Sequence, residues 1–343
     1  MRDEPDTMDG SSGRTPVAVV TGGTAGVGRA TVRALAARGY DVGVLARGVE
    51  GLAGTAREIE AAGQRGCTVP TDVADADAVE AAATQIEEEL GPVDVWVNNA
   101  MTTVFAPLVE ISAAEYERAT RVTYLGTVWG TMAALRRMRP RDRGTIVQVG
   151  SALAYRSIPL QAPYCGAKHA IRGFTDSLRS ELIHEGSQIH LTMVQLPALN
   201  TPQFDWCKAK LPRSPQPVPP IFEPEVAADA IVFAAEHRRR ELFVGLPTWK
   251  SVLGQKVIPG VLDSYLAHAA WEGQQTDQPL DEERPSNLFE PVAGDHGAHG
   301  RFDARARGWS PALEATERRR WLTGAAVLGG LGWLALRARG RGS

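Results

Sequence analysis

Short apolar runs recur along the first 250 residues, and each is followed by a longer stretch of mixed polarity. The runs are rich in valine, leucine and isoleucine and too short for helices, which is typical of buried strands. They cover residues 16–20, 40–45, 67–70, 93–97, 144–149, 189–196 and 241–244. The stretches between them suit helices, and strands that alternate with helices form parallel sheets with both faces covered. The pattern therefore predicts an α/β fold with a doubly wound parallel sheet of about seven strands.

A glycine-rich turn follows the first predicted strand. It reads Thr21-Gly22-Gly23-Thr24-Ala25-Gly26-Val27-Gly28, and a helix-compatible stretch comes next. Strand, glycine turn and helix in this order bind the pyrophosphate of a dinucleotide, because glycine lets the backbone approach and the helix N-terminus offers free N–H groups. We expect cofactor contacts from Thr21, Gly22, Thr24, Gly26, Val27 and Gly28. An ordinary strand–helix turn is the alternative.

The second predicted strand ends at Ala46-Arg47, without an acidic residue. A cofactor that lacks the 2′-phosphate usually meets a carboxylate here, on its ribose hydroxyls. The Arg47 guanidinium suits a 2′-phosphate instead, and the Thr24 hydroxyl is a candidate second contact. The sequence therefore favours NADP(H) over NAD(H), with a solvated turn residue as the alternative role of Arg47.

Candidate catalytic groups lie at and beyond the end of the fifth predicted strand. Tyr164 and Lys168 are four residues apart, which places them on one face of a helix. An ammonium favours a nearby tyrosinate, so we expect Lys168 to lower the pKa of Tyr164 from its ordinary value of about 10 and to make the phenol a usable acid and base. Ser151 follows the fifth strand, at the sheet edge where ligands bind in open α/β folds.

In this order, these motifs resemble the short-chain dehydrogenase/reductase family over about residues 17–245. T-G-x-x-x-G-x-G stands at residues 21–28, Asn98-Asn99-Ala100 ends the fourth strand, and Ser151 precedes Tyr164 by thirteen residues. The glycine spacing is similar to that of the single-domain oxidoreductases, whereas the branch rich in epimerases and dehydratases has T-G-x-x-G-x-x-G. The resemblance implies a Rossmann-type fold and hydride transfer with a nicotinamide cofactor.

The resemblance also implies a role for each matched residue. Tyr164 passes a proton to or from the substrate oxygen, Ser151 holds and polarises that oxygen, and Lys168 binds the nicotinamide ribose and lowers the pKa of Tyr164. Further cofactor contacts are implied for Asp72, Val73, Asn98, Asn99, Ala100 and Thr201. Family members commonly pair through the helix that carries the tyrosine, so a homodimer or homotetramer is implied.

Two positions depart from the family pattern. Thr123 stands in Val122-Thr123-Tyr124-Leu125-Gly126 where asparagine is usual, and that asparagine supports a water that links the lysine to solvent. The threonine side chain is shorter, which puts the implied proton relay in question, although its hydroxyl offers a site for a water. Met101 stands where glycine is usual and is expected to narrow the cleft near the cofactor.

A proline-rich segment, residues 202–224, follows the sixth strand. Its prolines predict a loop without regular structure, and its aromatic residues suit a substrate lid and a stiff surface excursion equally well. A C-terminal extension follows at residues 247–310, with a helical pattern over 249–271 and a polar, irregular pattern over 274–307. The extension contains His296 and His299 without an acidic or cysteine partner at metal-ligand spacing, so we expect no metal site.

The two ends of the chain differ in character. Residues 1–15 are polar and lack the apolar region of a signal peptide, so we expect a disordered lead-in. Residues 311–343 form a basic tail in which residues 321–336 are uncharged and bracketed by arginines. A membrane anchor, an interfacial helix on anionic lipid and a tail packed on protein are the alternatives for this segment.

Composition narrows the location and the partners. The three widely separated cysteines indicate a reducing compartment, so the catalytic domain is expected in the cytoplasm, with attachment to a membrane through residues 321–336 as an option. A formal net charge of −3 gives no indication of nucleic-acid binding.

The sequence thus predicts an NADP(H)-dependent oxidoreductase over residues 16–246 that acts on a carbonyl or secondary alcohol of an apolar molecule. The main alternative is a cofactor-binding regulator or scaffold with weak or no catalysis, because Thr123 and the long tail depart from the family pattern. The glycine spacing disfavours a third possibility, a lyase or epimerase that keeps its cofactor bound.

Overall fold

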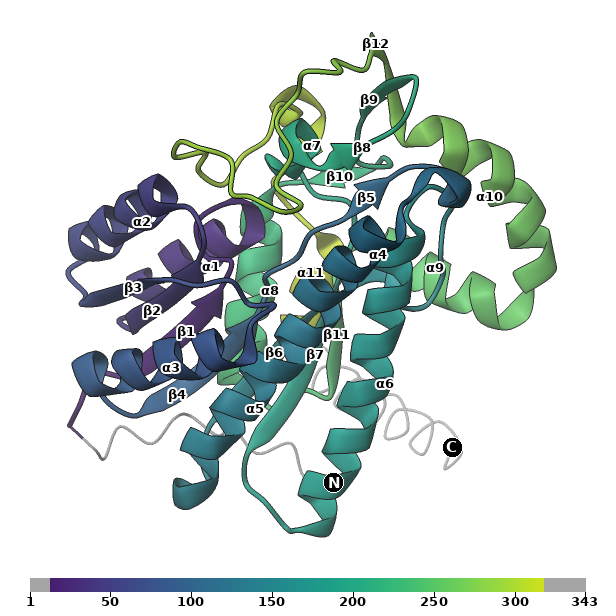
Figure 1. Cartoon of the computed structure of the whole chain (residues 1–343). Helices are drawn as coiled ribbons and strands as arrows, with labels where there is room; N and C mark the ends of the chain where they lie inside the picture. The colour runs from purple at the N-terminus through teal and green to yellow at the C-terminus, as the bar shows by residue number, and fades with distance from the viewer. Residues whose placement is uncertain (1–12, 318–343) are drawn as a thin grey trace, which may run out of the picture.

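The computed structural model describes residues 13–317 and is built on a seven-stranded sheet (Figure 1). The strands are β1 Val17–Thr21, β2 Asp41–Ala46, β3 Gly66–Pro70, β4 Val93–Asn98, β6 Thr145–Ser151, β7 His190–Leu196 and β11 Glu241–Phe243. Their order across the sheet is β3-β2-β1-β4-β6-β7-β11, and every neighbouring pair is parallel. The doubly wound, Rossmann-type sheet is therefore confirmed, with its topological switch point between β1 and β4.

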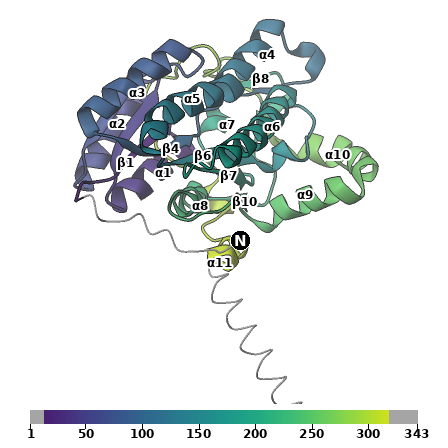
Figure 2. The same cartoon turned by 90° about the horizontal axis from the view of Figure 1, so that it is seen from below.

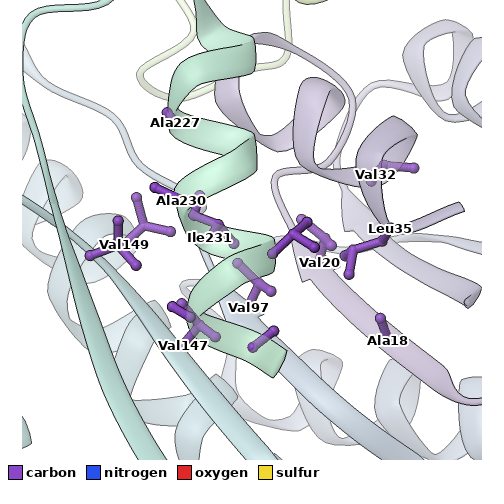
Figure 3. Close-up of a cluster of buried hydrophobic side chains, with 14 of the residues drawn as sticks. Ala18, Val20, Val32, Leu35, Val97, Val147, Val149, Ala227, Ala230 and Ile231 are labelled. Carbon is purple, nitrogen blue, oxygen red and sulfur yellow. The ribbon is translucent and has the colours of Figure 1, made fainter. Parts of the chain in front are cut away.

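Helices cover both faces of the sheet because successive strand residues point to opposite sides. In β1, Ala18 and Val20 pack under α1 Gly26–Ala37, α2 Val49–Ala61 and α8 Pro224–Glu236. Figure 3 shows Ala227, Ala230 and Ile231 of α8 against valines of β1, β4 and β6. Val17 and Val19 face α3 Ala76–Leu90, α5 Gly126–Met138 and α6 Ala162–His184 on the other side (Figure 2). The two apolar layers hold the carboxyl ends of the strands in register at one edge.

The helical segment between residues 113 and 138 is interrupted in the structure. α4 Ala113–Thr120 is preceded by its N-cap Ser112, which forms a capping box with Glu115. A π-helical turn, Arg121–Leu125, then separates α4 from α5. Single π turns inside helices are often found at functional sites, and this one carries Thr123, which departs from the family pattern.

The prediction that residues 202–224 lack regular structure is wrong. The segment forms α7 Gln203–Trp206, β8 Lys208–Ala209, β9 Arg213–Pro215 and β10 Ile221–Phe222. These short strands pair with β5 Val104–Phe105, β12 Gln275–Pro279 and β13 Ala306–Arg307, respectively. Their partners lie between 60 and 105 positions away in the chain, so local sequence patterns give no signal for them.

The C-terminal extension packs on the sheet domain rather than standing apart. It begins with two helices, α9 Leu246–Val257 and α10 Pro259–Gly273, where the sequence suggested one helical stretch. Pro259 starts the second helix, as expected for a residue that favours the first helical turn. After β13 the described chain ends with α11 Pro311–Glu317. Within residues 13–317 we find no helix that is both long enough and apolar enough to span a bilayer, and the predicted anchor, residues 321–336, lies outside that range.

Candidate active site

The three candidate catalytic residues meet at the carboxyl end of β6. Ser151 is the last residue of β6, and Tyr164 and Lys168 lie in the first two turns of α6. The backbone N–H of Ser151 donates to the Gln195 side chain at 2.7 Å, which fixes the end of the strand. The Ser151 hydroxyl accepts from the backbone N–H of Leu153 at 3.1 Å and lies near enough to the Tyr164 phenol to influence its pKa.

Lys168 is buried, with 3 % of its surface exposed, and its ammonium donates to the carbonyl oxygen of Val149 at 2.6 Å. Desolvation lowers the pKa of this lysine to about 8. Its nitrogen lies 5.5 Å from the centre of the Tyr164 ring. The lysine is therefore anchored to β6 and placed beside the phenol.

The expectation that Lys168 lowers the pKa of Tyr164 is wrong in this structure. Burial raises the pKa of the phenol to about 12, and the nearby Ser151 hydroxyl offsets that rise only in part. The ammonium donates to the backbone of Val149 instead of the phenolic oxygen. Tyr164 is consequently a neutral phenol at physiological pH, with a proton to donate.

One cavity of about 510 Å³ connects these residues with the glycine turn. From the predicted site it is lined by Gly22, Thr24, Gly26, Val27, Gly28, Arg47, Asp72, Val73, Asn99, Ala100, Ser151, Tyr164, Lys168 and Thr201. The structure thus brings together residues that are up to 180 positions apart in the chain. Its volume lies in the range that small-molecule and cofactor sites occupy, about 300–1,000 Å³.

The glycine turn requires its glycines at named positions. Gly22 and Gly26 have φ of 67° and 55°, in the left-handed region that other residues avoid. A side chain at Gly28 would lie 2.1 Å from the carbonyl oxygen of Gly22, and one at Gly26 would lie 3.2 Å from Thr201. The Asn99 amide holds the turn by donating to the carbonyls of Thr21 and Gly22. The turn therefore presents bare backbone to the cavity, opposite Thr201.

Two predicted cofactor residues, Thr21 and Asn98, are not part of the cavity lining. The Thr21 hydroxyl accepts from the backbone N–H groups of Asn99 and Ala100. The Asn98 amide donates to Thr131 and Gln148 and accepts from Trp96. Both side chains are buried at strand ends and hold the strands together, because a polar group buried there must find its partners within the protein.

The two departures from the family pattern have different surroundings. The Thr123 hydroxyl is fully buried, donates to the carbonyl of Thr102 at 2.8 Å and accepts from its N–H at 3.0 Å. The Thr123 hydroxyl is thus bonded to the backbone of Thr102 in the loop that follows β4, at the place where the sequence suggested a bound water. Met101, by contrast, lines the cavity as expected.

Arg47 lies at the cavity wall, but its partners come from the C-terminal extension. Its guanidinium donates to the carbonyl oxygens of Phe289 at 2.7 Å and Asn287 at 2.5 Å. Burial and the neighbouring Arg118 lower the pKa of Arg47 from its ordinary value. Sequence reasoning missed this contact, because residues 274–307 carry no periodic pattern that indicates where they pack.

The two histidines of the extension lie in different environments. His296 lines the cavity, and its ring packs edge-on against Trp206 with centroids 4.4 Å apart. His299 lies among Glu223, Glu225 and Asp303, and its Nε2 is 2.9 Å from Glu225. One ligand atom each from Glu223, His299 and Asp303 lie within 4.8 Å of one another. His299 thus has acidic partners, and two of them, the N-cap residue Glu223 and Glu225 in the first turn of α8, are far away in sequence.

The sheet order, the glycine turn and the Ser151, Tyr164 and Lys168 arrangement agree with a comparison to protein families. The family model described as short chain dehydrogenase matches residues 16–210, more than half of the chain. The chain belongs to the short-chain dehydrogenase family.

The similarity to known relatives extends beyond the catalytic domain in one case. The uncharacterized oxidoreductase YxnA of Bacillus subtilis is 29 % identical over 322 residues, which cover 93 % of this chain and 90 % of YxnA. The uncharacterized oxidoreductase Mb1570 of Mycobacterium bovis is 30 % identical over 253 residues, which cover 72 % and 71 % of the two chains. A similarity as long as that to YxnA includes much of the C-terminal extension.

Solved short-chain dehydrogenases match the catalytic domain. A metagenomic short-chain oxidoreductase in complex with NADP is 28 % identical, with a TM-score of 0.57, over 67 % of this chain and 97 % of that one. A variant of actinorhodin polyketide ketoreductase with NADPH is 27 % identical, with a TM-score of 0.59, over 67 % and 95 %. The bare glycine backbone, the facing Thr201 and the cavity volume fit the nicotinamide cofactor that such enzymes use.

Proposed function

We propose that this short-chain dehydrogenase is an NADP(H)-dependent oxidoreductase that interconverts a carbonyl and a secondary alcohol on an apolar molecule. The observation that carries the proposal is the shared cavity, which places Ser151, Tyr164 and Lys168 beside the glycine turn. A bound nicotinamide would supply the hydride, and the protein would position the substrate and manage the proton. Gly22, Val27 and Thr201 would hold the cofactor phosphates, Gly26 would let them approach the bare backbone, and Lys168 would hold the nicotinamide ribose.

In the direction of reduction, Tyr164 would act as the general acid. Because burial raises the pKa of Tyr164 to about 12, the side chain carries its proton and can donate it to the oxygen of a carbonyl substrate as negative charge develops there. The Ser151 hydroxyl would donate a second hydrogen bond to the same oxygen and polarise the carbonyl.

The substrate end of the cavity is apolar. The lining there includes Phe204 and Trp206 of α7, Leu266 of α10, and Val218 with several prolines of the segment 202–224. Side chains of this kind offer few hydrogen bonds, so they favour a hydrophobic substrate body whose carbonyl is its main polar group. The contacts of α7 and β10 with the extension favour a packed wall over a free surface excursion for this segment.

The preference for NADP(H) is part of the proposal. It is supported by the lack of an acidic residue at the end of β2, by Arg47 at the cavity wall, and by the NADP and NADPH in the solved relatives. Two donors of Arg47 are engaged by the extension, and a guanidinium has five. The remaining donors are sufficient for a 2′-phosphate.

The experiment that tests this function is a panel of ketones and aldehydes of increasing apolar size, followed by the loss of NADPH absorbance. The proposal expects turnover that increases with apolar size and stops when NADPH is omitted. A regulator or scaffold remains the second candidate, because Thr123 is tied to the backbone of Thr102 and is not free to support a proton relay. Tight NADPH binding with no substrate reduced across the panel would favour the regulator.

A further inference from the structure

A segment of the C-terminal extension crosses the cofactor end of the cavity. We call residues 286–299 the strap. In Figure 1 the chain beyond β12 runs as a yellow-green loop beside α1 and α2. Asn287, Pro291, Val292, Gly294 and His296 of the strap line the cavity, and Gly297 is bonded to the glycine turn. The extension thus encloses the cavity beside the glycine turn.

The first end of the strap is held by two arginines of the catalytic domain. Arg47 donates to the carbonyls of Asn287 and Phe289, and Arg118 donates to the carbonyl between them, that of Leu288, at 2.9 Å. Arg118 also pairs with Asp72 at 2.6 Å, so the strap is tied to two predicted cofactor residues at once. The Leu288 side chain is buried, which anchors this end in the core.

The second end is held at the glycine turn itself. The backbone N–H of Gly26 donates to the carbonyl of Gly297 at 3.0 Å. Arg29, which is 1 % exposed, pairs with Asp295 at 3.0 Å and with Glu58 at 2.6 Å. A side chain at Gly54 would lie 1.9 Å from the Asp295 carboxylate, so α2 leaves room for this carboxylate. The strap is therefore built into the fold at both ends.

We propose that the strap is a gate of the cofactor site, which closes over the adenosine half of a bound NADP(H) and must open for the cofactor to be exchanged. This inference rests on the proposed function. Arg47, which the sequence assigns to the 2′-phosphate, also holds the strap, and three of its five donors remain for the cofactor while the strap is closed. The Gly26 N–H is taken by Gly297 of the strap, so the closed strap leaves the phosphates to the neighbouring groups of the glycine turn. The strap, which lies outside the catalytic domain, would therefore slow the exchange of the cofactor.

The Arg29–Asp295 pair is the point at which the gate can be loosened without altering the cavity lining, since neither side chain belongs to it. Asp295→Asn keeps the shape and removes the charge, and Arg29 keeps Glu58 as its partner. Asp295 is about one third exposed, so we expect only a moderate effect, an opening equilibrium raised about tenfold. If release occurs from the open state, the rate constant of release rises by the same factor.

The test is stopped-flow displacement of NADPH from the full-length protein, with NADPH fluorescence as the signal. We expect Asp295→Asn to release NADPH about tenfold faster while its equilibrium affinity does not increase. Glu236→Gln is the matched control, because it breaks the Arg38–Glu236 pair far from the cavity, and its release rate should equal that of the wild type. An unchanged release rate in Asp295→Asn would overturn the gate. A higher NADPH affinity of Asp295→Asn would also overturn the gate, because the strap would then compete with the cofactor instead of closing over it.

Hydrogen exchange of the wild-type protein gives a second, independent measurement. Saturation with NADPH should slow amide exchange within residues 286–299, because the closed strap and the bound cofactor stabilise each other. Unchanged or faster exchange would overturn the gate. A wild-type protein that binds no NADPH would refute the proposed function itself. A protein that binds NADPH without slower amide exchange in the strap would refute only the gate.

Discussion

The buried ammonium of Lys168 makes a prediction about stability that needs no substrate. Desolvation lowers the pKa of this lysine from 10.5 to about 8 in the folded protein. At pH values between these two pKa values, the unfolded chain binds more protons than the folded one. Burial of the Lys168 charge therefore destabilises the fold at neutral pH, and this destabilisation decreases as the pH rises. The wild type should therefore gain stability from pH 7 to pH 9.5 relative to Lys168→Met, which has no charge to bury.

The size of this gain follows from the two pKa values. Integration of the proton difference between pH 7 and pH 9.5 gives about 2 kcal/mol in the free energy of unfolding. Above pH 10 the raised pKa of Tyr164 acts in the opposite direction, since the folded protein then binds more protons, so the upper limit of pH 9.5 avoids it. The contact with Val149 is lost in the variant at both pH values and largely cancels in the comparison.

Urea unfolding of the cofactor-free proteins at pH 7 and pH 9.5 measures the difference. The expected result is a free energy of unfolding that changes by about 2 kcal/mol more, in the stabilising direction, for the wild type than for Lys168→Met. Lys168→Arg is a useful control, since a guanidinium does not titrate in this range. An identical pH dependence in wild type and Lys168→Met would show that the lysine is not desolvated as the structure has it.

Three further predictions concern the cofactor, the extension and the tail. Arg47→Asp should weaken NADPH binding at least about tenfold more than NADH binding, as measured by titration; equal losses would point to the strap contacts alone. Burial lowers the pKa of His299, but the carboxylates of Glu225, Glu223 and Asp303 have a larger effect and raise it above its ordinary value. The protonated histidine therefore stabilises the fold at pH values below its ordinary pKa, and this stabilisation is lost as the pH rises through the raised pKa. From pH 6 to pH 8 the wild type should lose more stability than His299→Gln, by less than about 1 kcal/mol because the ring is partly exposed; parallel curves would contradict this. The anchor alternative for residues 321–336 predicts that deletion of residues 321–343 moves the protein from the membrane fraction to the soluble fraction, and an unchanged partition would contradict that alternative.

The parts of the fold that could be predicted from the sequence are those encoded locally. Each strand of the main sheet is a short apolar run, and its alternating residues fill two apolar layers, so the strand positions and the parallel direction of the strands followed from the pattern. The glycine turn was equally readable, because positive φ at Gly22 and Gly26 demands glycine whatever the surroundings. The spacing of Tyr164 and Lys168 likewise placed them together on α6.

The features that the sequence did not disclose depend on contacts between distant segments. Thr21 and Asn98 lie at strand ends, where cofactor-binding residues also lie. Only their buried hydrogen-bond partners distinguish their structural role from cofactor binding. The direction of the pKa shift of Tyr164 depends on how deeply the phenol is buried, which no spacing reveals. The strap lies in a polar stretch without periodicity, and its contacts with Arg29 and Arg47 span more than 240 residues.

The central claim is that Tyr164 donates the proton to a substrate oxygen held by Ser151 beside the bound cofactor. The most direct test is a single-turnover measurement with NADPH-loaded enzyme and an accepted carbonyl substrate, comparing wild type with Tyr164→Phe. Loss of the hydroxyl should slow NADPH oxidation by about 10²–10⁴-fold, the usual contribution of a general acid, while NADPH affinity stays within a few fold. A Tyr164→Phe enzyme that oxidises NADPH at the wild-type rate would contradict the claim.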